Sequence, residues 1–256
     1  MQLRAPHRES DLRVLRQLIR ENPLSLLTTV ISSPNFPLLQ TSHIPLVLDI
    51  EDETSETELG RLRGHIARAN PQSKAMIEAL TNNPQLNNII EQDVLVIFNS
   101  PVQHYVTPKF YTETKPTTGK VAPTWNYAAA QVYGHAKIFF DTKSEETSQF
   151  LAKQLADLSY HSETKIMGYT GGDNPVDWKV SDAPDRYIDL LMKSIIGIEI
   201  EITSLEGKFK MSQEMSVGDR EGVIEGFKRL GSETAQAMSR MVQHRGELKN
   251  TEKAQA

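Results

Sequence analysis

The feature that most constrains the fold is a regular alternation of side chains in the last third of the chain. Every second residue from Ile196 to Ile202 is isoleucine, and glycine or glutamate stands between them. Successive side chains of a strand point to opposite faces, so this pattern predicts a β-strand with one buried face. Weaker alternation over 59–67 and 132–140 predicts two further strands of the same kind.

Other extended segments precede or lie between these strands. Residues 24–31 and 38–48 flank a Ser-Ser-Pro-Asn turn string and predict a β-hairpin. The nearly continuous apolar run at 94–98 is typical of a buried central strand, and residues 104–107 are predicted to be its extended partner. Hairpin order of this kind favours an antiparallel sheet over a doubly wound parallel one.

Helices are predicted between the strands, where apolar residues recur at helical spacing. The predicted helices cover residues 10–22, the segment that begins at 70–71, the segment that follows a capping box at 142–145, residues 185–194, and two stretches of 217–249 that meet near Gly231. Ser10 and Asn70 are the predicted N-caps of the first two. The class predicted is therefore α+β, a mainly antiparallel barrel decorated by helices.

Two segments lack apolar periodicity and are predicted to be loops. Residues 51–58 are acidic and contain serine and threonine, which is typical of an exposed loop. Residues 160–182 contain a Gly-Gly and an Asn-Pro pair, so we expect a loop or a lid there.

Composition narrows the chemistry that the chain can perform. Its 256 residues include no cysteine, which excludes disulfides, thiolate nucleophiles and cysteine-based metal sites. A net charge of -5 argues against broad wrapping of nucleic acid, which needs a concentrated basic surface. No segment approaches the roughly 20 uncharged residues of a membrane span, so we expect a cytoplasmic protein with no membrane partner.

The common catalytic and nucleotide-binding signatures are missing from the sequence. It contains no GxGxxG fingerprint, no phosphate loop, no HExxH string and no GxSxG elbow. The seven histidines are scattered, without a pair at the helical spacing typical of a metal site. We therefore expect no metal site and assign no catalytic residue.

Five short strings mix strand-forming residues with polar side chains that a simple core does not need. They are Ser-His-Ile-Pro at 42–45, Gly-His-Ile-Ala-Arg-Ala-Asn-Pro-Gln at 64–72, His-Tyr-Val-Thr-Pro at 104–108, Pro-Thr-Trp-Asn-Tyr at 123–127 and Leu-Glu-Gly-Lys-Phe-Lys-Met-Ser-Gln at 205–213. Together they offer cations for a phosphate, amides and hydroxyls for a ribityl chain, and aromatic planes for a heterocycle. FMN presents a phosphate and such a ring.

The strings, their order and their spacing resemble the PaiB-type FMN-binding negative transcriptional regulators. This family is a branch of the FMN-binding split barrels that includes pyridoxamine-phosphate-oxidase-like proteins. The resemblance implies a split β-barrel domain at 1–213, a helical extension at 214–256 packed on the same domain or its dimer mate, and a homodimer with FMN at the subunit interface. Characterised bacterial members are described as negative regulators of protease and sporulation genes.

By position, the resemblance assigns His65 and Arg68 to the phosphate end of FMN, with Lys74 a further candidate from the adjacent helix. Asn70 is either a ligand contact or only a helix cap, because Asn-Pro is a sufficient reason for a helix to begin.

A second set is assigned to the flavin and its surroundings. This set comprises Ser42, His43, Tyr105, Thr107, Thr124, Trp125, Asn126, Lys208 and Gln213. Trp125 and Asn126 are expected to approach the isoalloxazine, while Lys208 and Gln213 are expected to reach the site of the neighbouring subunit. A buried aromatic anchor remains the alternative for Trp125, a cross-strand aromatic pair for Tyr105, and a structural histidine for His43.

Three functions stay open at this point. The first is an FMN-binding regulator of the PaiB type, although the sequence has no helix-turn-helix string and does not favour direct DNA binding. The second is an FMN-dependent oxidoreductase of the split-barrel class. The third is a haem-binding or cofactor-free interaction module.

Overall fold

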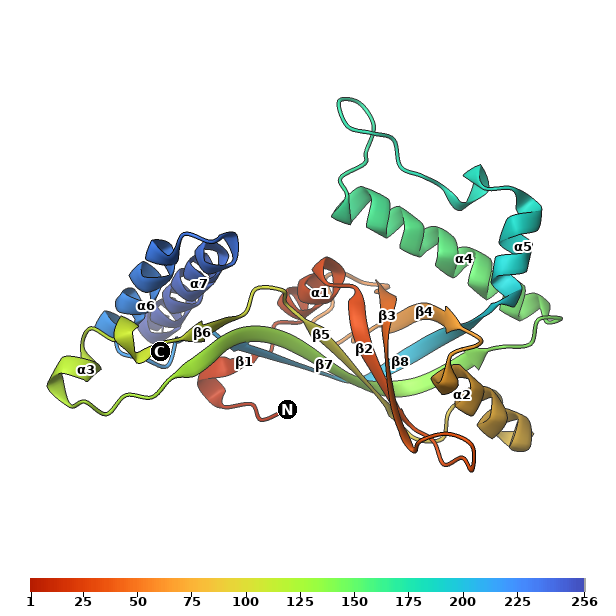
Figure 1. The fold of residues 1–256 in the computed structure, drawn as a ribbon, viewed down its shortest axis with the longest axis horizontal. Helices are drawn as coiled ribbons and strands as arrows, with labels where there is room; N and C mark the ends of the chain where they lie inside the picture. The colour runs from red at the N-terminus through yellow and green to blue at the C-terminus, as the bar shows by residue number, and fades with distance from the viewer. Residues whose placement is uncertain (256) are drawn as a thin grey trace. The chain divides into compact units, whose positions relative to one another are not determined.

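The computed structural model describes residues 1–255 of the chain, and the side chains of residues 1–251. An eight-stranded sheet organises them in the order β1-β8-β4-β3-β2-β5-β7-β6, and β8 also pairs with β7 (Figure 1). The strands are β1 (Arg8–Glu9), β2 (Leu24–Val30), β3 (Leu39–Asp49), β4 (Arg61–Ala67), β5 (Val94–Asn99), β6 (His104–Val106), β7 (Thr124–Phe139) and β8 (Ile195–Lys210).

The pairing of β8 with β7 closes six of the strands, β8, β4, β3, β2, β5 and β7, into a ring. Neighbouring strands with a described register, such as β2 with β3 and β4 with β8, run antiparallel. Gly134 of β7 lies where a Cβ atom would overlap the carbonyl oxygen of Glu201 in β8, so this close approach of the two strands requires glycine. The predicted class, a mainly antiparallel α+β split β-barrel decorated by helices, is confirmed.

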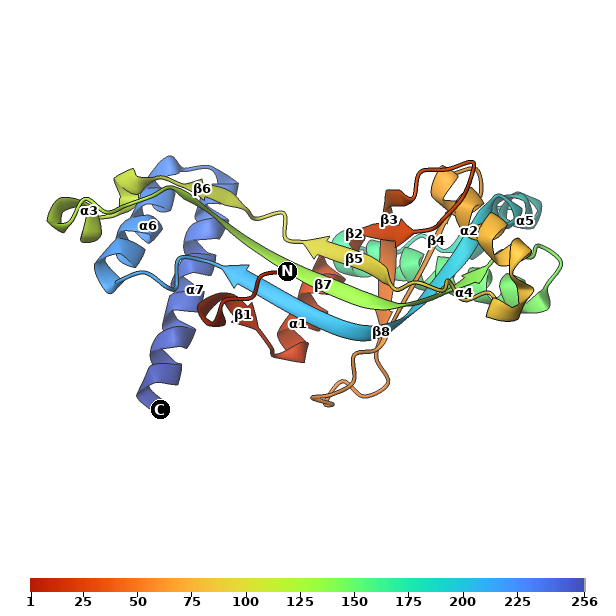
Figure 2. The ribbon, with the colours of Figure 1, turned by 90° about the horizontal axis from the view of Figure 1, so that it is seen from below.

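Seven α-helices decorate the sheet within the described part of the chain. They are α1 (Leu12–Glu21), α2 (Pro71–Asn82), α3 (Thr114–Thr117), α4 (Glu145–His161), α5 (Asp185–Lys193), α6 (Val217–Leu230) and α7 (Glu233–Gln255). α1 contacts β3, and α4 contacts β3 and β4. α6 packs along α7 (Figure 2). None of the helices within residues 1–255 combines the length and apolar character that crossing a bilayer requires.

The chain divides into two compact units. Unit 1 comprises residues 1–10, 99–130 and 206–256, and unit 2 comprises residues 11–98 and 131–205. β7 and β8 each contribute residues to both units. The sequence-based division at residue 213 stays a prediction.

Each unit buries its own apolar core. In unit 2 the core includes Leu27, Leu46, Leu62, Val96, Ile138, Ile196, Ile198 and Ile200, all fully buried. In unit 1 it includes Val223, Phe227, Ala235, Met238 and Val242 on α6 and α7, together with Met211. The alternating isoleucines therefore face the core as predicted. The predicted junction of the last two helices is also found, since α6 ends at Gly231, which adopts a φ of 74°.

The predicted helix caps are partly corrected. Asn70 caps α2 by accepting a hydrogen bond from the main-chain nitrogen of Gln72 at 2.8 Å, as predicted. The cap of α1 is Asp11 and not Ser10, because only Asp11 directly precedes the first turn and its carboxylate reaches the Arg13 amide at 2.8 Å. The cap of α4 is Ser144 and not Thr142, the first residue of the predicted 142–145 box, because the helix begins at Glu145.

The prediction that residues 104–107 pair with the strand at 94–98 is wrong. β6 pairs with β7 instead, with His104 opposite Asn126. The reason lies in the sheet order, since β5 already has β2 on one edge and β7 on the other. A strand has only two edges, so no edge of β5 is left for β6.

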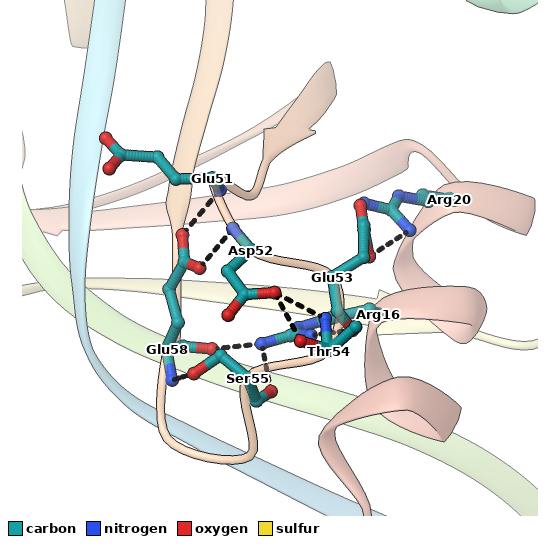
Figure 3. A network of polar contacts seen from close by, with 8 residues as sticks. All are labelled: Arg16, Arg20, Glu51, Asp52, Glu53, Thr54, Ser55 and Glu58. Carbon is teal, nitrogen blue, oxygen red and sulfur yellow. Dashed lines mark hydrogen bonds and ion pairs between the residues drawn. The ribbon is translucent and has the colours of Figure 1, made fainter.

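The acidic loop at 51–58 is exposed as predicted, but it is also fixed in place by a buried cation (Figure 3). Arg16 of α1 is 1% exposed, and its guanidinium donates hydrogen bonds to the carbonyl oxygens of Glu53, Ser55 and Glu58. The Glu58 carboxylate accepts hydrogen bonds from two main-chain amides at the start of the loop. Arg16 therefore organises the loop, because buried guanidinium donors need acceptors.

The segment predicted as a loop or lid is mostly irregular, as expected. A π-helical turn at Ser162–Ile166 continues α4, and a 3-10 turn at Val180–Asp182 precedes α5. Gly168, Gly171 and Gly172 all adopt positive φ between these turns, a conformation that glycine adopts without steric cost. Its role as a lid stays a prediction.

Candidate functional site

The middle of the polar face of β4 in unit 2, at Arg63, is covered by neighbouring side chains. Arg63 is 5% exposed and pairs with the carboxylates of Asp49 and Asp157, the latter at 2.7 Å. The hydrogen bond that Arg63 donates to the Asp49 carboxylate is the largest of the causes that raise the pKa of Arg63 above its usual value. Because Asp157 lies on α4, this helix covers the strand face that alternation had marked as basic.

His65, predicted to lie at the phosphate end, follows the same pattern. Its Nδ1 atom lies 2.7 Å from Oε1 of Gln154 on α4. Burial lowers the pKa of His65, outweighing the opposite effect of the hydrogen bond to Gln154. The imidazole is therefore neutral near pH 7, which makes it a weak partner for a phosphate.

Arg68, the second predicted phosphate residue, donates its hydrogen bonds to the main chain. Its guanidinium contacts the carbonyl oxygens of Phe140 at 2.5 Å, Lys193 at 3.3 Å and Ile195 at 3.5 Å. It also lines a cavity of about 100 Å³, well below the volume of roughly 300 Å³ from which ligand pockets usually begin. Arg68 therefore joins the end of β4 to the ends of β7 and α5 and the start of β8.

Three further candidates of unit 2 form what we call the phosphate-side cluster, Ser42, Asn70 and Lys74. The Asn70 Nδ2 atom donates a hydrogen bond to the Ser42 hydroxyl at 3.1 Å, while its Oδ1 atom caps α2. Lys74 lies in the first turn of α2 and is exposed. A lysine beside a helix N-terminus provides positive charge and suits an anionic group.

His43 lies apart from the phosphate-side cluster. It is exposed on β3, opposite Leu26 of β2, whereas its neighbour Ser42 points to the other face of the strand. Around His43, the outer face of β2, β3 and β5 is largely aliphatic, which is unusual for a solvent-facing sheet surface. This outer aliphatic face consists of Leu24, Leu26, Val30, Leu39, Pro45, Leu95 and Ile97.

In unit 1 an aromatic pair is exposed. Tyr105 of β6 lies directly opposite Trp125 of β7, with ring centroids 6.1 Å apart and an angle of 66° between the ring planes. Trp125 is 55% exposed and Tyr105 is 42% exposed. Tyr105 therefore forms the predicted cross-strand pair, and Trp125 is not a buried anchor.

Lysines of β8 lie close to these aromatic residues. Lys208 and Lys210 alternate with buried Phe209 and so share the outer face of the strand. The Lys208 Nζ atom lies 5.4 Å from the ring centroid of Tyr127, and Lys210 donates a hydrogen bond to the carbonyl oxygen of Trp125 at 3.0 Å. We call Tyr105, Trp125, Tyr127, Lys208 and Lys210 the ring-side surface.

Positive charge is concentrated on this surface. Burial, followed by the charges of Lys208 and Arg4, lowers the pKa of Lys210, while Glu214 acts in the opposite direction. Arg8 of β1 lies directly opposite Lys208. Neighbouring cations repel one another, so a bound anionic or electron-rich group would be stabilised here.

Four predicted residues of unit 1 have structural partners. Asn126 is fully buried and donates to the Ser212 hydroxyl at 3.0 Å. Gln213 is 6% exposed and accepts a hydrogen bond from the Met211 amide, while Thr107 caps a 3-10 turn. Thr124 accepts a hydrogen bond from Lys210. Trp125 and Asn126, predicted to act together, thus point to opposite faces of β7.

Sequence reasoning missed Tyr127 and Lys210 as members of this surface. Both lie within strings that the sequence had singled out, two residues from Trp125 and Lys208 respectively. In a strand, residues two apart share a face, whereas adjacent residues do not. That periodicity was the available signal, and it favours Tyr127 over Asn126 as the neighbour of Trp125.

Comparison with known proteins gives a consistent assignment. The model of the family described as "Putative FMN-binding domain" matches residues 1–204. An uncharacterized protein of Aspergillus fumigatus is 55% identical over 259 residues, covering 98% of this chain and 99% of its own. The protease synthase and sporulation protein PAI 2 of Bacillus subtilis is 26% identical over 226 residues, covering 88% of each chain. A conserved hypothetical protein from Mycobacterium tuberculosis of known structure is similar at a TM-score of 0.45 and 14% identity, covering 85% of this chain and 98% of its own.

Proposed function

The chain belongs to the FMN-binding domain family, whose cofactor is FMN, and on this premise we propose that it binds FMN as a homodimer. In this proposal FMN lies at the interface of two copies of the chain, with the isoalloxazine on the ring-side surface of one copy and the phosphate at the phosphate-side cluster of the other. The observation that carries it is the exposed pair of Trp125 and Tyr105 beside two lysines. Aromatic side chains that are exposed side by side, with polar residues at their rim, often mark the surface where a ligand or partner binds.

The residues present fit the chemistry of the cofactor. The isoalloxazine is a flat heterocycle that stacks on aromatic side chains, and Trp125 offers an accessible ring. Lys208 and Lys210 would stabilise negative charge on the ring, while Lys74 and the Ser42 hydroxyl would bind the phosphate oxygens. When bound, FMN supplies one-electron and two-electron transfer.

A homodimer is supported by the outer aliphatic face of unit 2. Leu24 is 61% exposed and Leu39 is 64% exposed on this face. Because the same patch occurs on each copy, two chains could bury it against each other through an isologous contact. His43 would then lie within the subunit interface.

The first experiment measures the cofactor directly. Protein purified without added cofactor is expected to show a flavin absorption spectrum, and light scattering is expected to give the mass of a dimer. Trp125→Ala is expected to lose FMN affinity, while the matched change Trp178→Ala at the other exposed tryptophan keeps it. A Soret band in place of the flavin spectrum, or equal affinity in both variants, would contradict the proposed site.

A second candidate function, more specific than FMN binding, is the regulation of gene expression. The observation that favours it is the similarity to PAI 2 of Bacillus subtilis. The net charge of -5 opposes binding to DNA phosphates and therefore disfavours regulation through direct DNA contact. A mobility-shift assay of FMN-loaded and FMN-free protein with labelled promoter fragments at physiological salt tests it, and retardation without sequence preference would reject specific DNA recognition.

A further inference from the structure

Unit 2 contains a cavity of about 350 Å³ that the FMN proposal does not use. β4, α4, α5, the start of β8 and the segment 162–180 contribute to its walls. Its apolar lining includes Leu155, Leu158, Trp178, Ile188 and Leu191. The volume falls within the range of about 300 to 1,000 Å³ that is usual for small-molecule sites.

The apolar side chains around this cavity are incompletely covered. α5 is an amphipathic helix, yet none of its residues, all within the described chain, is buried. Ile188 and Leu191 of α5 line the cavity, and Leu191 is 41% exposed. Trp178, which lines the same cavity from the segment that precedes α5, is 47% exposed. An amphipathic helix normally buries its apolar stripe, so a ligand between α5 and Trp178 would complete the packing.

The polar groups of the cavity define what kind of ligand fits. No lysine, arginine, aspartate or glutamate is among the described residues that line it, and His65 is its one titratable group. The Oε1 atom of the Gln154 side chain can only accept a hydrogen bond, so the Nδ1 atom of His65 donates to it and Nε2 is left as a hydrogen-bond acceptor. A charged ligand would find no counter-charge here and would lose its hydration.

We propose that this cavity is a second binding site, for a small uncharged aromatic molecule that carries a hydrogen-bond donor such as a phenolic hydroxyl. Trp178 supplies an aromatic plane, His65 accepts the hydrogen bond, and the aliphatic side chains of α4 and α5 enclose the ring. A cavity of about 150 Å³ already holds benzene, so the volume found here suits two fused rings. The proposal does not depend on FMN binding.

The test uses matched naphthalene compounds and an uncharged fluorescent probe. N-phenyl-1-naphthylamine is titrated into the purified protein with and without saturating FMN, and competitors then displace it. We expect 1-naphthol to compete best, naphthalene, which lacks the donor, to bind about tenfold more weakly, and 1-naphthoate, which is an anion, to compete least. Binding of the probe should be unaffected by FMN.

Two variants locate the site and its acceptor. Ile188→Trp fills the cavity from α5, where no buried packing must be broken, and should weaken probe binding by at least about tenfold. Tyr187→Trp, a neighbouring exposed position that does not line the cavity, is the control and should bind the probe normally. His65→Phe should remove the preference for 1-naphthol over naphthalene.

Several results would overturn the proposal. They are the absence of saturable probe binding, equal effects of the two tryptophan variants, a preference for the anion, and competitive displacement of the probe by FMN. The last result would assign the cavity to the flavin itself, and it would leave the FMN-binding function intact.

Discussion

Two groups of predicted site residues differ in how much of their binding capacity is free. In unit 2, His65 and Arg68 form hydrogen bonds within the protein, to a glutamine side chain and to three carbonyl oxygens. In unit 1, Trp125 and Tyr105 are about half exposed, and their rings form an edge-to-face pair with each other. Residue type indicates what a side chain can bind, whereas burial and hydrogen bonding decide whether that capacity remains available to a ligand.

The largest expected effect concerns Arg68. If its main role is to join strand ends, Arg68→Ala should lower the free energy of unfolding by about 2 to 3 kcal/mol, because charge-assisted hydrogen bonds to three carbonyl groups are lost. Urea denaturation measures this change. The unfolding free energy of Arg68→Lys should lie between those of the natural protein and Arg68→Ala, since an ammonium cannot reproduce the guanidinium geometry. If Arg68→Ala kept its stability but lost FMN, Arg68 would be a phosphate ligand, and the contrast between the two groups of residues would not hold.

The ring-side surface should behave in the opposite way. Trp125→Ala is expected to weaken FMN binding by about tenfold to a hundredfold, because stacking on an aromatic side chain contributes about 1 to 3 kcal/mol. Its thermal midpoint should shift by less than about 2 °C, since an exposed side chain contributes little to the core. Fluorescence titration and thermal denaturation measure the two quantities. A large fall in stability would give Trp125 a structural role.

The regular parts of the fold could be predicted because their signals are local. The isoleucine alternation at 196–202 and the Asn-Pro start of α2 depend on periodicity and capping, which neighbouring residues determine. The partner of β6 could not be predicted, because strand order depends on which edges other strands occupy. The role of Arg16 was missed for a similar reason, since its acceptors lie 37 or more residues away in sequence.

The sequence could predict which residue types the candidate site contains, but not which of those residues face outward together. The strings at 64–72 and 123–127 do contain the exposed tryptophan, the helix cap and the polar strand residues. Which of them face outward depends on covering elements such as α4, whose first residue, Glu145, is far in sequence from Arg61, the first residue of β4. A string that resembles a ligand site therefore contains both contacting residues and the residues that support them.

A smaller effect separates the two roles of Asn70. Asn70→Ala removes the cap of α2 and should cost about 1 kcal/mol of stability. Asn70→Asp keeps an equivalent cap, so stability should be retained, but its negative charge beside Lys74 should weaken FMN binding if the phosphate lies there. Chemical denaturation and FMN titration of both variants give the answer. FMN affinity unchanged in Asn70→Asp would remove the phosphate from this cluster.

The smallest effect is a pH dependence at His65. Burial lowers the pKa of its imidazole below the ordinary value of 6.5, so between these two pKa values the unfolded chain binds the proton more readily than the folded protein. Stability should therefore be unaffected by this residue above pH 6.5 and should fall as the pH drops below it, by less than about 1 kcal/mol at pH 6. Because other histidines also titrate, the measurement is the difference in unfolding free energy between the natural protein and His65→Phe across this range. A difference that grows in favour of the natural protein at low pH would mean that His65 is charged when folded, and it would restore His65 as a candidate for the phosphate.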